Sequence, residues 1–325
     1  MYPTTIATDV SVVICTYNGQ DRLPEVLDAL MAQAVPAELR WEIVVVDNSS
    51  TDRTSEVAAA YAARSPVPLK VVVERRQGLA YARRRGLLES TGRIISNLDD
   101  DTIVDPTWVH AVHEFFQTHP RAGLVGGRIL PKLDVAAPPY FDRVKKSLAL
   151  SDLGDDVLNL TLSPHGHPIM PHSGCRREAI KPSLLRESFE VTGRCGNKLS
   201  SCEDSVLAIE VRRAGWEWWY NPAMQMQHHI PPRRLTEDYL CRLLAGMGES
   251  AAQMKKVELG RVLTLAESVR EAARLAVRYV YYSVVRLIGR QRPARQFARM
   301  AAAMYRSGTA SYFAELRRTV TGDRR

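Results

Sequence analysis

Three consecutive carboxylates, Asp99, Asp100 and Asp101, follow directly on the strand-like segment at residues 94–98. Like charges this close repel one another unless hydrogen-bond donors or a cation neutralise them. Carboxylate oxygens are the ligands that hard divalent cations prefer. The segment therefore predicts a metal site at the end of a strand and chemistry on phosphates, with a solvated turn as the alternative.

A second acidic pair, Glu203 and Asp204, stands at the start of residues 203–214, which have the apolar spacing of a helix closed by Gly215. The helix dipole favours anions at that position, so capping is the ordinary explanation. An enzyme that transfers a group from a sugar diphosphate needs a metal for the leaving diphosphate and a separate base for the acceptor. Residues 99–101 could supply the first and Asp204 the second.

The elements that must position these carboxylates alternate between strands and helices. Apolar, β-branched runs predict strands at residues 10–15, 41–46, 69–73 and 94–98. Helical spacing or composition predicts helices at residues 23–31 and 79–88, and a third that starts near residue 52 and ends before Pro66. Continuous apolar strands of this kind predict an α/β fold, Rossmann-like, with a mainly parallel sheet covered by helices on both faces.

Polar clusters follow three of the predicted strands, at residues 16–18, 47–50 and 99–101. Ligands of open α/β sheets bind beyond the carboxyl ends of the strands, so the three clusters predict one shared site. Residues 126–200 are less regular and rich in Gly, Pro, His and Arg, and we expect them to form substrate-contacting loops.

The chain's basic character is concentrated at its C-terminal end. The formal net charge is +8, and residues 233–325 hold 19 Arg and Lys against 8 Asp and Glu. This region reads as helical, with arginines every fourth residue at 270, 274 and 278, and has no uncharged run of the ~20 residues that a membrane span needs. We expect helices that either lie on an anionic membrane surface or pack on the catalytic domain or a second subunit.

Cellular location is predicted from the N-terminus and the cysteines. No basic stretch followed by a long apolar run opens the sequence, so we expect no secretory signal and residence in the cytoplasm. Five scattered cysteines without a Cys-x-x-Cys pair argue against a disulfide framework or a zinc ribbon. We expect reduced thiols, most of them in the core.

The order of these motifs resembles the family 2 inverting glycosyltransferases of the GT-A fold, in particular those that build bacterial polysaccharides and glycolipids. The resemblance runs from residue 10 to about residue 229, and six segments in register carry it. The segments are VVICTYN at 12–18, VVDNSSTD at 45–52, GLAYAR at 78–83, DDD at 99–101, CED at 202–204 with RAGW at 213–216, and NPA at 221–223 leading to His228. It predicts a catalytic domain at residues 1–232 and a C-terminal region at residues 233–325.

The resemblance implies which residues bind the nucleotide-sugar donor. Thr16, Tyr17 and Asn18 would line the nucleotide pocket, Asp47 would accept hydrogen bonds from the base, and Arg83 would lie near the base or phosphate. The resemblance does not choose among UDP, GDP and dTDP, and we favour UDP as the most frequent nucleotide. The acceptor would be a saccharide or a lipid-linked sugar, in cell-surface polysaccharide or glycolipid synthesis.

The metal site and the base are implied in the same way. Asp99 and Asp100 would face the donor sugar, and Asp101 would bind Mg²⁺ or Mn²⁺, with Asp99 and His228 close to the metal or diphosphate. The resemblance further assigns the general base to Asp204 and an orienting role to Glu203.

One departure from the family lies on the acceptor side. Where members often carry a Gly-Gly-Asn-like segment, residues 170–175 read Met-Pro-His-Ser-Gly-Cys.

Two other classes of function remain open from the residues alone. A nucleotidyltransferase acting on a sugar phosphate would share the sheet and the metal carboxylate, but would leave Asp204 without a hydroxyl to deprotonate. A non-catalytic basic scaffold would predict salt-sensitive binding through the C-terminal region. No groove-reading motif, zinc finger or Walker-type loop supports nucleic acid as a partner. A homo-oligomer stays open.

Overall fold

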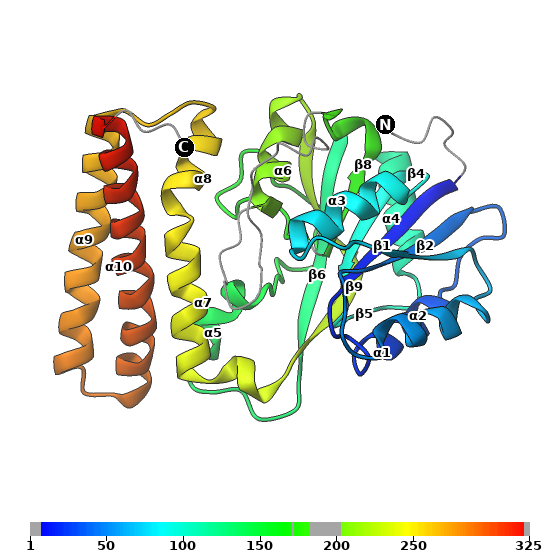
Figure 1. Cartoon of the computed structure of the whole chain (residues 1–325), viewed down its shortest axis with the longest axis horizontal. Helices are drawn as coiled ribbons and strands as arrows, with labels where there is room; N and C mark the ends of the chain where they lie inside the picture. Colours follow the sequence, from blue (N-terminus) through cyan, green and yellow to red (C-terminus); the bar gives the residue numbers. More distant parts are fainter. Residues whose placement is uncertain (1–7, 171, 183–202, 322–325) are drawn as a thin grey trace. The chain divides into compact units, whose positions relative to one another are not determined.

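The computed structural model describes residues 8–170, 172–182 and 203–321, with the side chains of 203–204 and 319–321 outside the description. The chain divides into two compact units (Figure 1). The sheet unit comprises Met1–Lys132, Ala149–Val191 and Leu207–His229, and the helical unit comprises Leu133–Leu148, Thr192–Val206 and Ile230–Arg325. The predicted boundary at residue 232 between a catalytic domain and a C-terminal region stays a prediction.

A mixed sheet forms the centre of the sheet unit, and its described strands number nine. Its first half is parallel, in the order β3 (Leu69–Val73), β2 (Trp41–Asp47), β1 (Thr8–Thr16), β4 (Gly92–Asp99). The order continues with β8 (His172–Arg176), β6 (Ala122–Leu133), β9 (Glu217–Ile230) and β5 (Thr102–Val104), while β7 (Leu158–Asn159) pairs with β9. The second half is antiparallel where its pairing is described, between β4 and β8, β6 and β8, and β5 and β9.

Helices connect and cover these strands. They are α1 (Leu23–Met31), α2 (Thr54–Ala62), α3 (Leu79–Glu89), α4 (Trp108–Thr118) and α6 (Glu203–Arg213), with a 3₁₀ turn at Arg177–Ala179. The predicted α/β fold with a mainly parallel sheet is confirmed. The antiparallel half was not predicted, and β6 and β8 form part of the region that was expected to be irregular.

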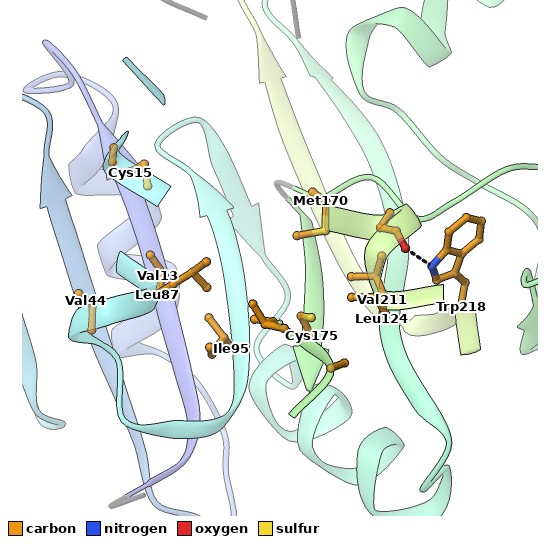
Figure 2. Close-up of a cluster of buried hydrophobic side chains, with 14 of the residues drawn as sticks. Val13, Cys15, Val44, Leu87, Ile95, Leu124, Met170, Cys175, Val211 and Trp218 are labelled. Atoms are coloured by element: carbon orange, nitrogen blue, oxygen red, sulfur yellow. Dashed lines mark hydrogen bonds between the residues drawn. The ribbon is translucent and has the colours of Figure 1, made fainter. Parts of the chain in front are cut away.

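The two faces of the sheet follow from the alternation along each strand. On one face, Val13, Ile95 and Leu87 of α3 belong to a buried cluster that extends to Val211 of α6 (Figure 2). On the other face, Gly174 of β8 lies against Phe116 and Val112 of α4. Strands buried on both sides need continuous apolar runs, which explains why residues 12–15 of β1 and 43–46 of β2 are all apolar.

The described cysteines are free thiols, as the sequence predicts. Cys15 and Cys175 are buried, and Cys241 is half-buried. Burial raises the pKa of Cys175 to about 12, because the thiolate would lose its hydration. Cys175 is therefore an unreactive part of the core shown in Figure 2.

The helical unit is built on long helices. It contains α5 (Phe141–Val144), α7 (Glu237–Glu249), α8 (Ala251–Leu259), α9 (Leu265–Ile288) and α10 (Arg292–Thr321), with 3₁₀ turns at Lys145–Leu148 and Pro232–Leu235. Thr264 and Glu267 form a capping box that starts α9. Gly248 allows α7 to approach α10 closely, since a Cβ there would lie 2.2 Å from the Met304 carbonyl oxygen. None of the helices described is long and apolar enough to span a membrane.

Candidate active site

The register of the parallel strands brings the predicted polar clusters to one edge of the sheet. Thr16 at the end of β1 lies opposite Asp47 at the end of β2, and the preceding residue, Cys15, lies opposite Asp99 on β4. Neighbouring strands are about 4.8 Å apart, so the three strand ends lie within the span of one nucleotide-sized ligand.

The loop after β1 is fastened to the loop after β2. Asn18 has a φ of 48°, in the left-handed region that asparagine tolerates better than most residues. Its side-chain oxygen accepts a hydrogen bond from the Thr51 backbone at 2.8 Å, and its own N–H donates to Ser50 Oγ at 2.9 Å. Tyr17, the residue before Asn18, is 45% exposed. The loop thus presents an aromatic ring at the strand ends, where it could stack on a ligand.

The buried Asp100 side chain hydrogen-bonds residues on both sides of the loop that follows β1. Its carboxylate accepts hydrogen bonds from Thr16 Oγ1 at 2.6 Å and from Arg22, at 3.1 Å from Nε and 2.8 Å from a terminal nitrogen. Burial raises the pKa of Asp100, and the hydrogen bonds from Arg22 oppose that rise. A Cβ on Gly19 would lie 2.2 Å from Thr16 Oγ1, so the loop closes over this network. With these partners Asp100 positions the loop, and its direct contact with a donor sugar stays a prediction.

Asp47 is buried and organises the loop that follows β2. One of its oxygens accepts from the Ser50 backbone N–H at 2.9 Å, and the other accepts from the Ser55 hydroxyl. The next residue, Asn48, donates to the carbonyl oxygens of Glu74 and Arg76. Each carboxylate oxygen can accept more than one hydrogen bond. The predicted contact between Asp47 and a nucleotide base is therefore compatible with this network, and stays a prediction.

Asp99 faces α3. A terminal nitrogen of Arg83 lies 3.4 Å from its Oδ1, and the two side chains are 11% and 28% exposed. Both residues were predicted at the nucleotide-sugar site, and they lie together at the end of β4. The pair keeps a cation beside the ligand edge of the sheet, where a diphosphate would need one.

Asp101 and His228 form the second pair at this edge. Asp101 Oδ1 lies 3.4 Å from His228 Nε2, and these side chains are 14% and 2% exposed. The β5–β9 pairing places them, because Thr102 lies opposite His228 and the His229 N–H donates to the Asp101 carbonyl oxygen at 2.8 Å. Two predicted metal ligands from distant parts of the sequence are thereby brought together.

The donor set suits a hard divalent cation. Mg²⁺ binds in proteins through one or two carboxylates, with water and substrate phosphates completing its shell, and Mn²⁺ also accepts imidazole. Asp101 and His228 together offer one carboxylate and one imidazole. Within the described residues no group of three or more His, Cys, Asp or Glu could hold a metal ion by itself. The residues therefore fit a metal whose shell is completed by the substrate, and Asp99 as a further ligand stays a prediction.

His172 is a buried neighbour of this pair that sequence reasoning did not single out. Its Nδ1 lies 3.1 Å from Thr102 Oγ1, and its ring centroid lies 5.4 Å from that of His228. It lies in the segment that departs from the family pattern at residues 170–175. The departure from the family pattern was the sequence signal that could have drawn attention to His172. Arg22 was also missed, since a lone arginine before a helix carries no motif.

The predicted catalytic carboxylates stand at the start of α6. The helix begins at Glu203, so Glu203 and Asp204 occupy its first turn. Their side chains lie outside the described residues, and their roles as orienting residue and base stay predictions.

Comparison of the chain with known protein families, relatives and solved structures identifies its class. The glycosyl transferase family 2 model matches residues 11–181, more than half of the chain, and the chain belongs to that family. A glycosyltransferase is therefore established, in preference to a nucleotidyltransferase or a scaffold.

Relatives and solved structures agree with that class. The chain is 30% identical over 134 residues to the glucosyl-dolichyl phosphate glucuronosyltransferase of Haloferax volcanii, 41% of this chain and 42% of that protein. It is 24% identical over 230 residues to the putative teichuronic acid biosynthesis glycosyltransferase TuaG of Bacillus subtilis, 68% of this chain and 90% of that protein. The chain thus spans less than half the length of the first of these relatives and most of the second.

Two solved structures share the fold. S. aureus TarS 1-349 in complex with UDP-GlcNAc has a TM-score of 0.55 at 16% identity, covering 97% of this chain and 92% of that one. The mannosyltransferase PcManGT from Pyrobaculum calidifontis, in complex with GDP-Man and Mn²⁺, has a TM-score of 0.54 at 19% identity, covering 99% and 91%. The GT-A architecture predicted from the sequence is confirmed.

Proposed function

We propose that this glycosyltransferase is metal-dependent and inverting, and that it moves a sugar from a nucleotide diphosphate to a hydroxyl acceptor in cell-surface polysaccharide or glycolipid synthesis. The observation that carries the proposal is the meeting of Asp101 and His228 at 3.4 Å, at the edge where Thr16, Asp47 and Asp99 also end their strands. A phosphate-binding metal and a nucleotide pocket would then share one ligand-binding edge.

In the proposed reaction, Asp204 takes the proton from the acceptor hydroxyl. The hydroxyl oxygen attacks the anomeric carbon, the bond between that carbon and the diphosphate oxygen breaks, and the bonding electrons leave with the nucleotide diphosphate. One displacement of this kind inverts the configuration. Arg83 and Asp99 orient the donor, while Arg22 and Asp100 hold the loop that bears Tyr17 against it.

A bound Mg²⁺ or Mn²⁺ would neutralise charge that builds up on the leaving diphosphate. Asp101 and His228 would hold it. The Mn²⁺ in the PcManGT complex supports this choice of cofactor, at the level of a shared fold. The two neighbours carry different nucleotides, UDP-GlcNAc and GDP-Man, so the preference for UDP is the part of the proposal that binding data must decide.

The acceptor we propose is a saccharide or a lipid-linked sugar. The names of two relatives support it, one a teichuronic acid biosynthesis glycosyltransferase and the other a transferase acting on a dolichyl phosphate sugar. A lipid-linked acceptor would place the enzyme in the cytoplasm, peripherally on the cytoplasmic face of a membrane.

Nucleotide binding by calorimetry tests the donor site. UDP, GDP and dTDP are each titrated with and without Mn²⁺ into the intact chain and into Asp101→Asn. We expect one nucleotide to bind in a Mn²⁺-dependent way, with affinity at least about tenfold lower in Asp101→Asn because a metal ligand is lost. The matched control is Asp156→Asn, which removes an exposed carboxylate of the same unit and should bind normally. Metal-independent binding, or binding that Asp101→Asn leaves unchanged, would refute the metal assignment.

A further inference from the structure

The long helix α9 leaves one side apolar and exposed. Its exposed apolar residues range from 45% to 79% in exposure, and we call them the α9 stripe. The stripe consists of Leu265, Val269, Val277, Val280, Tyr281, Val284, Leu287 and Ile288. From Val277 the positions 280, 284 and 287 follow at steps of three and four, Tyr281 and Ile288 are next to them, and Leu265 and Val269 lie two and three turns earlier on the same side of the helix. At 1.5 Å per residue the stripe is about 35 Å long.

The opposite side of α9 packs inside the helical unit. Ala272 is 2% exposed and belongs to a buried cluster with Tyr312 of α10, and Leu275 packs against that cluster. The ring of Tyr282 stacks on that of Tyr305 of α10, with the ring centroids 5.5 Å apart. Figure 1 shows α9 and α10 lying side by side. The stripe therefore is not the face that holds the helical unit together, and so large an exposed apolar surface marks an interaction site.

Charge decides which partner suits the stripe. Residues 272–314 contain arginines but no Lys, Asp or Glu, and the two carboxylates of α9, Glu267 and Glu271, stand in its first two turns and pair with Arg261 and Arg274. The arginines are Arg274, Arg278, Arg286, Arg290, Arg292, Arg295, Arg299 and Arg306. A second copy docked on this stripe would bring arginines against arginines, which costs electrostatic energy. An anionic partner gains from the same charges.

The turn between α9 and α10 adds a pocket for an anion. A cavity of about 390 Å³ is lined by Arg286, Arg292, Arg295 and Arg299, with Glu237 and Gln296. Arg299 is held by Glu237 and Asp238, both at 2.9 Å. Within the described part of the chain, no carboxylate forms an ion pair with the other three arginines. Guanidinium groups gathered in this way suit the oxygens of a phosphate.

We propose that the α9 stripe and this arginine pocket bind a membrane surface that carries anionic lipid phosphates. The apolar side chains enter the boundary between headgroups and acyl chains, and Tyr281 lies at headgroup level. Arg292 and Arg295 of the pocket stand four and seven residues after Ile288, in the first turns of α10, so the pocket and the last residues of the stripe lie at the same end of the α9–α10 pair. A lipid phosphate bound there would have its acyl chains near the end of the stripe. The benefit of this attachment, access to a lipid-linked acceptor, rests on the proposed function, whereas the binding itself does not.

Co-sedimentation of the full chain with vesicles tests the proposal. Phosphatidylcholine vesicles are compared with vesicles in which about a third of the lipid is phosphatidylglycerol. We expect binding to the anionic vesicles, with the partition coefficient reduced about fivefold for each arginine removed in Arg292→Gln/Arg295→Gln. Val280→Asp should reduce it by at least about tenfold, because a carboxylate enters the apolar face.

Matched controls come from the sheet unit. Leu162→Asp changes a 94% exposed apolar residue, and Arg53→Gln removes an exposed arginine, and both should bind vesicles as the unaltered chain does. Nucleotide binding is measured on every preparation, so a failed donor site and a failed membrane surface give different results.

Three results would overturn the proposal. Vesicle binding that is absent, or equal in the variants and the unaltered chain, would remove it. Thermal stabilisation by millimolar inorganic phosphate without vesicle binding would assign the pocket to free phosphate. A dimer in sedimentation velocity that Val280→Asp abolishes, without vesicle binding, would assign the stripe to a second copy of the chain.

Discussion

The ion pair between Arg22 and Asp100 should hold the nucleotide loop in place. Arg22→Met keeps the apolar stem of the side chain and removes its charge. Asp100, whose side chain is 12% exposed, would then keep the hydrogen bond from Thr16 but lose both bonds from Arg22. Breaking a fully buried ion pair costs roughly 3–5 kcal/mol. Arg22 is 31% exposed, so solvent screens the pair and we expect a loss of about 2 kcal/mol in the free energy of unfolding.

Urea unfolding, followed by tryptophan fluorescence, measures this loss in the sheet unit, which contains both Arg22 and Asp100. The chain's five tryptophans all lie in segments of the sheet unit, at residues 41, 108, 216, 218 and 219. Their signal therefore reports the unit that contains Arg22. A double-mutant cycle with Asp100→Asn isolates the interaction, and we expect a coupling energy of about 1–2 kcal/mol.

Nucleotide affinity should fall with stability, because Arg22 also donates to the Tyr17 carbonyl oxygen at 3.2 Å. Arg53→Met is the control, since Arg53 pairs with Glu56 on an exposed surface where solvent screens such pairs and they add little to stability. A coupling energy below about 0.5 kcal/mol, or equal losses in Arg22→Met and Arg53→Met, would refute the reasoning.

Two further predictions concern the rim of the site. Burial raises the pKa of Glu74, but hydrogen bonds from Arg76, one at 3.0 Å from Nε, outweigh this and lower it below the ordinary 4.5. The ionised form is thus favoured by folding, so its contribution is present above about pH 4.5 and is lost as the pH falls through the lower folded pKa. Urea midpoints should drop less with acid in Glu74→Gln, and an identical drop would contradict the assignment. His172→Asn should weaken Mn²⁺ binding about tenfold in the presence of nucleotide, because His172 supports His228. Titration followed by electron paramagnetic resonance measures this, with the half-buried His113 of α4 as the control, in His113→Asn. Equal Mn²⁺ affinities of His172→Asn and the unaltered chain would show that His172 serves packing alone.

The sequence by itself determined the parallel half of the sheet and its ligand edge. Residues 12–15 of β1 and 43–46 of β2 are buried on both faces and are all apolar, and the polar residue that follows each run marks the end of its strand. The sequence alone therefore predicts that Thr16, Asp47 and Asp99 lie at one edge of the sheet. Local patterning carries this information because each element needs only its own residues to be recognised.

Only the tertiary structure decided which of these side chains meet. Asp101 and His228 come together through the pairing of β5 with β9, and Arg22 reaches Asp100 across 78 residues of chain. Such partners depend on long-range register and on side-chain direction, which leave no periodic trace in the sequence. The same holds for α9, whose residues are apolar on two sides. The sequence indicated an amphipathic basic helix, but packing against α10 decided which side stayed exposed.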